Sequence, residues 1–277
     1  MGGFFIFTQM QLPPLMSEAP IGIFDSGLGG LTVRREILSL MPWEDTVYLA
    51  DSANAPYGEK SPGKILELSR RNTEWLLKQG CKLIVVACNT ATTNAIATLR
   101  REFEVPFIGI EPAIKPAALK SRSKKIGVLA TRGTLASSLF ANTSRLYASG
   151  IEVLEQEGKG LVRIIESGKW REASTRVHLK SLLEPMLAAG IDYLVLGCTH
   201  YPLLIPQLRE LLPPSVEILD PGPAVARQAL AVLTSKNLAR NTERSSRHQV
   251  VTTGDTELTN RILGWLGYPQ QARPLSF

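Results

Sequence analysis

The sequence predicts an α/β protein with two similar lobes, each built on an open, mostly parallel sheet, and related by pseudo-twofold symmetry. Short apolar runs alternate with helical stretches along the chain, which is typical of strands buried between layers of helices. Two of these runs end in a cysteine, at Cys88 and Cys198. Ile21 precedes Cys88 by 67 positions and Ile126 precedes Cys198 by 72, so a strand start and a cysteine recur in the same order.

Each element of the first repeat follows from local sequence. An apolar run at 20–24 turns through glycines into a helix that reaches about residue 40, and a second strand covers 46–51. A loop rich in turn residues holds Tyr57 between Pro56 and Gly58, and we expect this tyrosine to be an exposed loop residue. The remaining elements are a helix at 62–78, a strand at 83–87, a helix beginning after Cys88, and a strand at 105–110.

The second repeat starts at a strand over 125–130, which is followed by a turn rich in hydroxyl groups. A strand at 193–197 ends at Cys198, and Pro202 lies in the first turn of the next helix. A helix at 224–233, a strand at 248–253 and a helix to about residue 266 complete the chain. We expect a poorly ordered tail at 1–19, lobe A at 20–111 and 221–277, and lobe B at 112–220, with crossings at Glu111-Pro112 and Asp220-Pro221.

Composition narrows the classes of function. Three cysteines in 277 residues without a secretory leader indicate a reducing, cytoplasmic setting, and the apolar start of the chain is too short to span a membrane. The net charge is +6, with a basic cluster at 115–125. This cluster has few interleaved aromatic residues for stacking on bases, and 25 acidic residues offset 31 basic ones. We therefore expect neither a nucleic acid nor a membrane as partner.

The first glycine-rich turn also allows a weaker interpretation as a nicotinamide-dependent oxidoreductase. Gly27, Gly29 and Gly30 follow the first strand, and an acid, Asp51, follows the second. The third glycine of the dinucleotide fingerprint is missing, and Asp25 would place a negative charge beside the pyrophosphate. A binding or regulatory protein for amino acids on the same scaffold is another alternative.

Two free thiols at equivalent strand ends limit the chemistry. A pseudo-twofold arrangement would bring Cys88 and Cys198 to one active-site cleft between the lobes. A structural disulfide is disfavoured in a reducing compartment, a cysteine hydrolase with His200 as base leaves Cys88 without a role, and a metal site lacks ligands at standard spacings. Inversion of a stereocentre fits best, because one base removes a proton from one face while a second acid delivers a proton to the other.

Cysteine suits this proton transfer. A free thiol has a pKa of about 8.5, and we expect the helix that begins after each cysteine to lower that value toward neutral pH. One sulfur would be thiolate while the other is thiol, so the two should titrate as a coupled pair. The third cysteine, Cys81, is expected to be a buried core residue.

Five motifs give the chain a resemblance to the glutamate racemases, cofactor-independent enzymes of the aspartate/glutamate racemase superfamily. The resemblance covers about residues 21–266, and aspartate racemases are the nearest competitors, although they tend to carry an acid after the second Cys-Thr pair. The motifs are Phe24-Asp25-Ser26-Gly27-Leu28-Gly29-Gly30, Pro56-Tyr57-Gly58, Cys88-Asn89-Thr90-Ala91, Gly109-Ile110-Glu111-Pro112-Ala113 and Gly197-Cys198-Thr199-His200-Tyr201-Pro202.

The resemblance implies interconversion of L- and D-glutamate by two cysteines, with no cofactor or metal, and supply of D-glutamate for bacterial peptidoglycan. It makes Cys88 and Cys198 the two bases, assisted by Asp25 and His200, and implies a homodimer. Glu166 matches an acid near the second cysteine, although the preceding segment 157–160 lacks the Cys-Pro pair common in the family. The implied substrate-binding residues are Asp25, Ser26, Tyr57, Gly58, Asn89, Thr90, Thr199 and His200.

Overall fold

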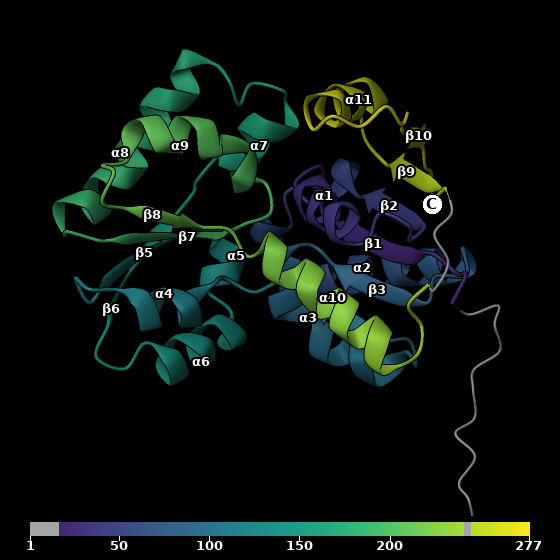
Figure 1. Cartoon of the computed structure of the whole chain (residues 1–277). Coiled ribbons are helices and arrows are strands. Elements are labelled where there is room, and N and C mark those ends of the chain that lie inside the picture. The colour runs from purple at the N-terminus through teal and green to yellow at the C-terminus, as the bar shows by residue number, and fades with distance from the viewer. Residues whose placement is uncertain (1–16, 241–244) are drawn as a thin grey trace, which may run out of the picture.

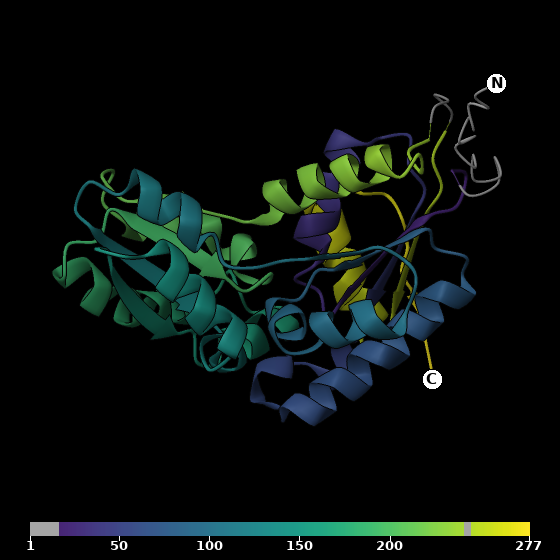
Figure 2. The same ribbon diagram turned by 90° about the horizontal axis from the view of Figure 1, so that it is seen from below.

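A computed structural model describes residues 17–240 and 245–277, so most of the expected tail at 1–19 lies outside the described residues. Within them, two parallel sheets lie side by side, each flanked by helices (Figures 1 and 2). One sheet has the order β10-β9-β2-β1-β3-β4 and the other β6-β5-β7-β8, and every strand pair in both is parallel. We call the first sheet with its helices lobe A and the second lobe B.

The strands and helices have the following bounds. The strands of lobe A are β1 Ile21–Asp25, β2 Thr46–Ala50, β3 Leu83–Val86, β4 Phe107–Gly109, β9 His248–Thr252 and β10 Arg273–Pro274. Those of lobe B are β5 Lys125–Ala130, β6 Glu152–Glu157, β7 Tyr193–Gly197 and β8 Glu217–Leu219. The helices are α1 Leu31–Leu40, α2 Pro62–Lys78, α3 Asn89–Glu102, α4 Ile114–Lys120, α5 Arg132–Leu135, α6 Ser138–Tyr147, α7 Leu161–Glu166, α8 Ala173–Ala188, α9 Ile205–Leu211, α10 Gly222–Ser235 and α11 Thr256–Trp265, with short 3-10 turns η2 Ser52–Asn54, η3 Tyr57–Glu59 and η4 Tyr201–Leu204.

The strand orders confirm the predicted duplication. Strands β2-β1-β3-β4 of lobe A correspond to β6-β5-β7-β8 of lobe B, so β1 matches β5 and β3 matches β7. Cys88 follows β3 and Cys198 follows β7, and these two strands each pair with the central strand of their repeat. Equivalent positions in the two sheets therefore carry the two cysteines.

Both faces of sheet A are buried, as its apolar strand sequences predict. Successive side chains of β3 alternate between two clusters: Val85 packs in the cluster with α1, α10 and α11, whereas Val86 packs in the cluster with α2 and α3. Figure 1 shows α1 and α11 on one side of the sheet and α2 and α3 on the other. Because the two layers of helices exclude water, the polar ends of the strands are the places where chemistry can occur.

Two strands have no sequence signal of this kind. β6 reads Glu-Val-Leu-Glu-Gln-Glu and lies at the edge of sheet B, where three glutamates face solvent. Charged side chains protect such an edge from pairing with another chain, but they also hide it from a search for apolar runs. β10 is only two residues long and pairs with β9.

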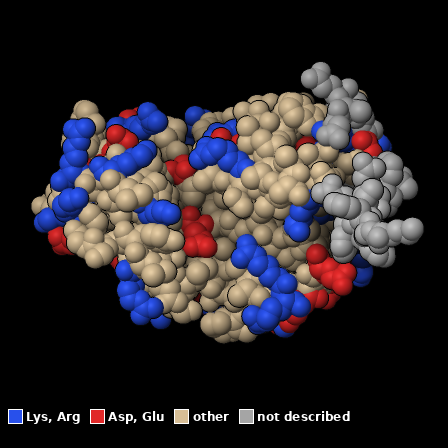
Figure 3. Space-filling model, turned by 60° about the horizontal axis from the view of Figure 1, so that its bottom comes forward, with Lys and Arg blue, Asp and Glu red and all other residues tan. Residues whose placement is uncertain are grey.

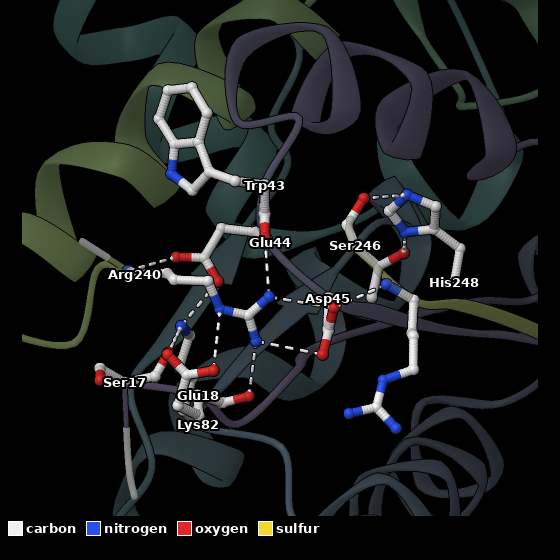
Figure 4. Close-up of polar contacts among 11 residues, drawn as sticks. Ser17, Glu18, Trp43, Glu44, Asp45, Lys82, Arg240, Ser246 and His248 are labelled. Atoms are coloured by element: carbon white, nitrogen blue, oxygen red, sulfur yellow. Dashed lines mark hydrogen bonds and ion pairs between the residues drawn. The ribbon is translucent and has the colours of Figure 1, made fainter. Parts of the chain in front are cut away.

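A buried polar network fastens the described start of the chain to the base of lobe A (Figure 4). Lys82, next to β3, lies 2.6 Å from Glu44 and donates to the Ser17 carbonyl. Arg240 donates to both carboxylate oxygens of Asp45. Breaking a buried ion pair of this kind costs about 3–5 kcal/mol, so this network is a structural element. Among the described helices, none combines the length and the hydropathy required to cross a bilayer.

Candidate active site

The two cysteines lie where strands of the two lobes end. Cys88 directly precedes α3 and is its N-cap, and its sulfur accepts a hydrogen bond from the Ala91 amide at 3.4 Å. Cys198 directly follows β7, and the tight turn η4 separates it from α9. Both side chains are buried, at 5% and 6% exposure. Strand ends of this kind are the usual ligand sites of open α/β sheets.

Both thiols line one enclosed cavity between the lobes. Its free volume is about 10 Å³, which is room for a single water molecule, so the cavity must widen to admit a substrate as large as an amino acid. The residues around it are Ser26, Pro56, Tyr57, Gly58, Cys88, Asn89, Thr90, Thr131, Val162, Cys198, Thr199 and His200. An adjoining outer cavity of about 340 Å³ shares Pro56, Gly58, Thr131 and Val162 with it.

Burial is the largest influence on the pKa of Cys88. Its thiol donates to the Ser26 hydroxyl at 3.5 Å. Burial, followed by the charge of Asp25, raises the pKa of Cys88, although the contacts with Ser26 and Ala91 oppose that shift. The expectation that the helix start would lower this pKa is therefore wrong, because one amide at 3.4 Å does not offset the loss of water.

Polar contacts connect Cys198 to His200 and His200 to Glu166. Its sulfur lies 3.8 Å from Nδ1 of His200, and Nε2 of the same ring lies 2.5 Å from the Glu166 carboxylate. Burial lowers the pKa of His200, but the contacts with Cys198 and Glu166 outweigh it and raise that pKa well above its ordinary value. With both ring nitrogens protonated, His200 can donate to Glu166 and to a Cys198 thiolate.

Glu166 connects the lobes at this point. It ends α7 of lobe B, and its carboxylate accepts a hydrogen bond at 2.6 Å from the Leu28 amide in the glycine-rich turn of lobe A. Glu166 does not line the inner cavity. Its carboxylate is hydrogen-bonded to His200, which does line the cavity, so its position is one step behind Cys198.

Asp25 lies behind the cavity wall and is fully buried. Its carboxylate accepts hydrogen bonds from the Gly30 amide at 2.8 Å and from the Thr199 hydroxyl at 3.2 Å. Burial raises the pKa of Asp25, whereas the charge of His200 and the Gly30 amide act in the opposite direction. Asp25 therefore connects the first turn of lobe A with the turn that follows Cys198.

Tyr57 is not the exposed loop residue that the sequence predicts. Its side chain is 1% exposed and lines the cavity, because hydrogen bonds hold its hydroxyl group inside lobe A. The hydroxyl donates to Asp51 at 2.6 Å and accepts from the Asn72 amide at 3.1 Å. Burial, followed by the charge of Asp51, raises the pKa of Tyr57 well above its ordinary value, so this phenol keeps its proton.

Polar groups suited to a ligand surround the cavity. Both polar atoms of the Asn89 side chain are buried without a hydrogen-bond partner, and buried amides normally have partners. Thr90 contacts Thr131 at 2.8 Å and Thr134 at 3.3 Å across the lobes. Sequence reasoning did not assign these two threonines a role, although the hydroxyl-rich turn after the strand at 125–130 is the signal that could have found them.

Three further observations concern the surroundings of the site. A surface cavity of about 720 Å³ is lined by Asp45 and His248 at the opposite ends of the strands and contains neither cysteine of the site. Among the described residues, no group of three or more His, Cys, Asp or Glu side chains is placed to hold a metal ion. On the face seen in Figure 3, Lys and Arg lie over both lobes beside Asp and Glu.

Comparison with known proteins identifies the family. Residues 34–229 match the Asp/Glu/Hydantoin racemase family. A glutamate racemase of Roseiflexus is 45% identical over 255 residues, which are 91% of this chain and 94% of the relative. A glutamate racemase isoform from Bacillus anthracis superposes with a TM-score of 0.86 at 30% identity, covering 94% of this chain and 98% of that one. The Escherichia coli enzyme, solved with L-glutamate and an activator, superposes with a TM-score of 0.83 at 32% identity over 93% and 98%. The chain therefore belongs to the glutamate racemases of the Asp/Glu/Hydantoin racemase family, which are isomerases.

Proposed function

We propose that this protein interconverts L- and D-glutamate, with Cys88 and Cys198 as the two bases. The observation that carries the proposal is that these two thiols, from equivalent strand ends, line one enclosed cavity. One thiolate removes the α-proton from one face of the substrate while the other thiol delivers a proton to the opposite face. The roles exchange in the reverse direction. The reaction is proposed to need no cofactor or metal, as the resemblance implies.

The other residues of the site receive auxiliary roles in this proposal. Asp25 and His200 assist the proton transfers, and Glu166 holds His200 in its charged form. The substrate carboxylates are bound by neutral donors, among which the unpartnered amide of Asn89 is the best supported. The backbone amides at the start of α3 add to these donors because a helix N-terminus favours negative charge. The wall of the cavity is completed by Ser26, Tyr57, Gly58, Thr90, Thr131 and Thr199.

The cavity is suited to a very weak acid such as the α-proton of an amino acid. A thiolate that has lost its water is a stronger base, and fixed donors stabilise the charge that develops at the α-carbon. We infer that the D-glutamate supplies bacterial peptidoglycan synthesis in the cytoplasm. Assembly into a homodimer stays a prediction, which sedimentation of the purified protein would test.

Circular dichroism of L-glutamate and L-aspartate, each incubated with purified protein and no added cofactor, tests the proposal. Loss of the glutamate signal with an unchanged aspartate signal is expected. Loss of the aspartate signal alone would indicate an aspartate racemase. If both signals persist and no solvent deuterium enters the α-carbon, the chain binds amino acids without converting them.

A further inference from the structure

A buried carboxylate outside the reaction described above stands behind the substrate pocket. Asp51 directly follows β2 and is completely buried. One of its oxygens accepts the Tyr57 hydroxyl at 2.6 Å, and the other accepts Asn54 and Thr253 at 2.9 and 3.0 Å. Asp51 therefore joins the strand ends of lobe A to the loop that carries the pocket wall at Tyr57.

The positive charge against this carboxylate comes from Arg71 on α2. Its Nη2 lies 3.0 Å from each oxygen of Asp51. The ring of Phe277 lies over the same guanidinium, with its centroid 3.8 Å from Cζ. An aromatic face attracts a cation in this arrangement, so Phe277 and Asp51 together fix the position of Arg71. Among the described residues, Arg71 is the cation paired with Asp51, and removing it would leave this carboxylate buried without that charge, which is unfavourable.

We propose that Arg71 is a positioning residue for the substrate pocket, which fixes the Tyr57 ring through Asp51. The inference rests on the proposed role of Tyr57 in substrate binding. Tyr57 lines the cavity but takes no part in the proposed proton transfers, so we expect it to contact substrate and transition state alike. Loosening it therefore raises KM with little change in kcat, whereas loss of a base lowers kcat.

The geometry also predicts which substitution is tolerated. A single nitrogen, Nη2, makes both contacts with Asp51, so the bidentate fork of arginine is not used. A lysine ammonium, as one point charge, can serve the same two oxygens. Arg71→Lys should therefore preserve the pocket, whereas Arg71→Met removes the charge and keeps most of the apolar stem.

The test compares racemisation kinetics of Arg71→Met, Arg71→Lys and the control Arg70→Met. Arg70 is the neighbouring residue on α2 and pairs with Glu102 on the surface, at 2.5 Å and 40% exposure of its side chain. We expect Arg71→Met to raise KM roughly tenfold, the scale of a hydrogen bond to a charged group, with kcat within about twofold. Arg71→Lys should restore KM to within about threefold and Arg70→Met should match the wild type.

A double-mutant cycle with Tyr57→Phe separates positioning from a general loss of stability. Removing the Tyr57 hydroxyl breaks the connection to Asp51, so Arg71→Met should add less than about twofold to KM in that background. If Arg71→Met alone does not fold, the cycle is run in Asp51→Asn, where Arg71→Met should again be nearly silent. An unchanged KM in Arg71→Met, or a full tenfold effect in either background, would overturn the proposal. Wild-type protein that racemises nothing would instead contradict the proposed function.

Discussion

The two cysteines occupy equivalent places in two similar sheets, but their neighbours differ in charge. Cys88 meets the Ser26 hydroxyl and a backbone amide, and burial raises its pKa. Cys198 faces His200, whose pKa is raised by its contacts with Cys198 and Glu166. The duplicated fold thus supplies two positions for a thiol, while the loops after the strands give the two thiols different neighbours. A histidine with a raised pKa lies beside Cys198, whereas a hydroxyl and a backbone amide lie beside Cys88.

Thermodynamics limits how this difference between the two cysteines can affect the kinetics. L- and D-glutamate are enantiomers with equal free energies in water, so kcat/KM must be the same in both directions. Unequal support for the two sulfurs can therefore appear only as different kcat and KM values that compensate each other. Substitutions that alter one cysteine or its neighbours at a time show what each half of the site contributes.

The largest effect is expected from removing either sulfur. Cys88→Ser and Cys198→Ser should each reduce racemisation at least about 100-fold, because each removes one of the two proposed proton-transfer groups. Initial rates in both directions, followed by circular dichroism, measure the loss. Cys81→Ser is the matched control, because Cys81 is buried away from the cavity and should retain full turnover. A single-cysteine variant with near-normal turnover would contradict the two-base scheme.

A steric change on the Cys198 side comes next. A Cβ added at Gly29 would lie 2.4 Å from Nδ1 and 2.5 Å from the backbone nitrogen of His200, so the imidazole must leave Cys198. We expect Gly29→Ala to lower kcat about 100-fold, as displacements of about 1 Å do in active sites. Gly63→Ala, where nothing lies within 4 Å of the added Cβ, should leave kcat unchanged.

Neutralising Glu166 should have a smaller effect with a defined pH dependence. The raised pKa of His200 stabilises the fold fully below the unfolded-state value of about 6.5, and this contribution is lost as pH rises through the folded-state value. Glu166→Gln should lower the His200 pKa, measured by NMR of labelled histidine, and reduce kcat roughly tenfold. The deficit in melting temperature should be largest below pH 6.5 and shrink above it. An unchanged His200 titration would show that Glu166 does not set its charge.

The smallest effect is expected on the Cys88 side. Ser26→Ala removes the hydroxyl that accepts the Cys88 thiol and opposes the rise of its pKa. We expect alkylation of Cys88 to shift to higher pH and racemisation to fall about two- to fivefold. A loss as large as that of Cys88→Ser would mean that the hydroxyl, rather than the sulfur, is the essential group on this side.

The sequence predicts much of this fold because its strands are apolar on both faces. Continuous runs such as Leu83–Val86 and Tyr193–Gly197 need no partner to be identified, and the repeat places a cysteine after each. The edge strand Glu152–Glu157 carries three glutamates and has no such signal. It becomes a strand because β5 offers it a ladder of hydrogen bonds, which is a tertiary cause.

The site shows the same division between local and distant causes. The position of Cys88 at a strand end is local and was predicted. The burial of Tyr57 was not, because it depends on Asp51, Asn72 and the packing of α2 beneath the loop. The raised pKa of Cys88 was also missed, since burial between two lobes is absent from the one-dimensional pattern of a strand and a helix start.

The central claim, two bases on opposite faces, is tested most directly by racemisation in D₂O at the first few percent of conversion. If one thiol removes the α-proton and the other supplies a solvent-derived deuteron, the product enantiomer is fully deuterated at the α-carbon while the remaining substrate keeps its protium. The reaction is started from L- and from D-glutamate in turn. Mass spectrometry after chiral separation then gives the deuterium content of the product and of the remaining substrate. Protium carried into the product in either direction would mean that a single group moves the proton across, and would contradict the account.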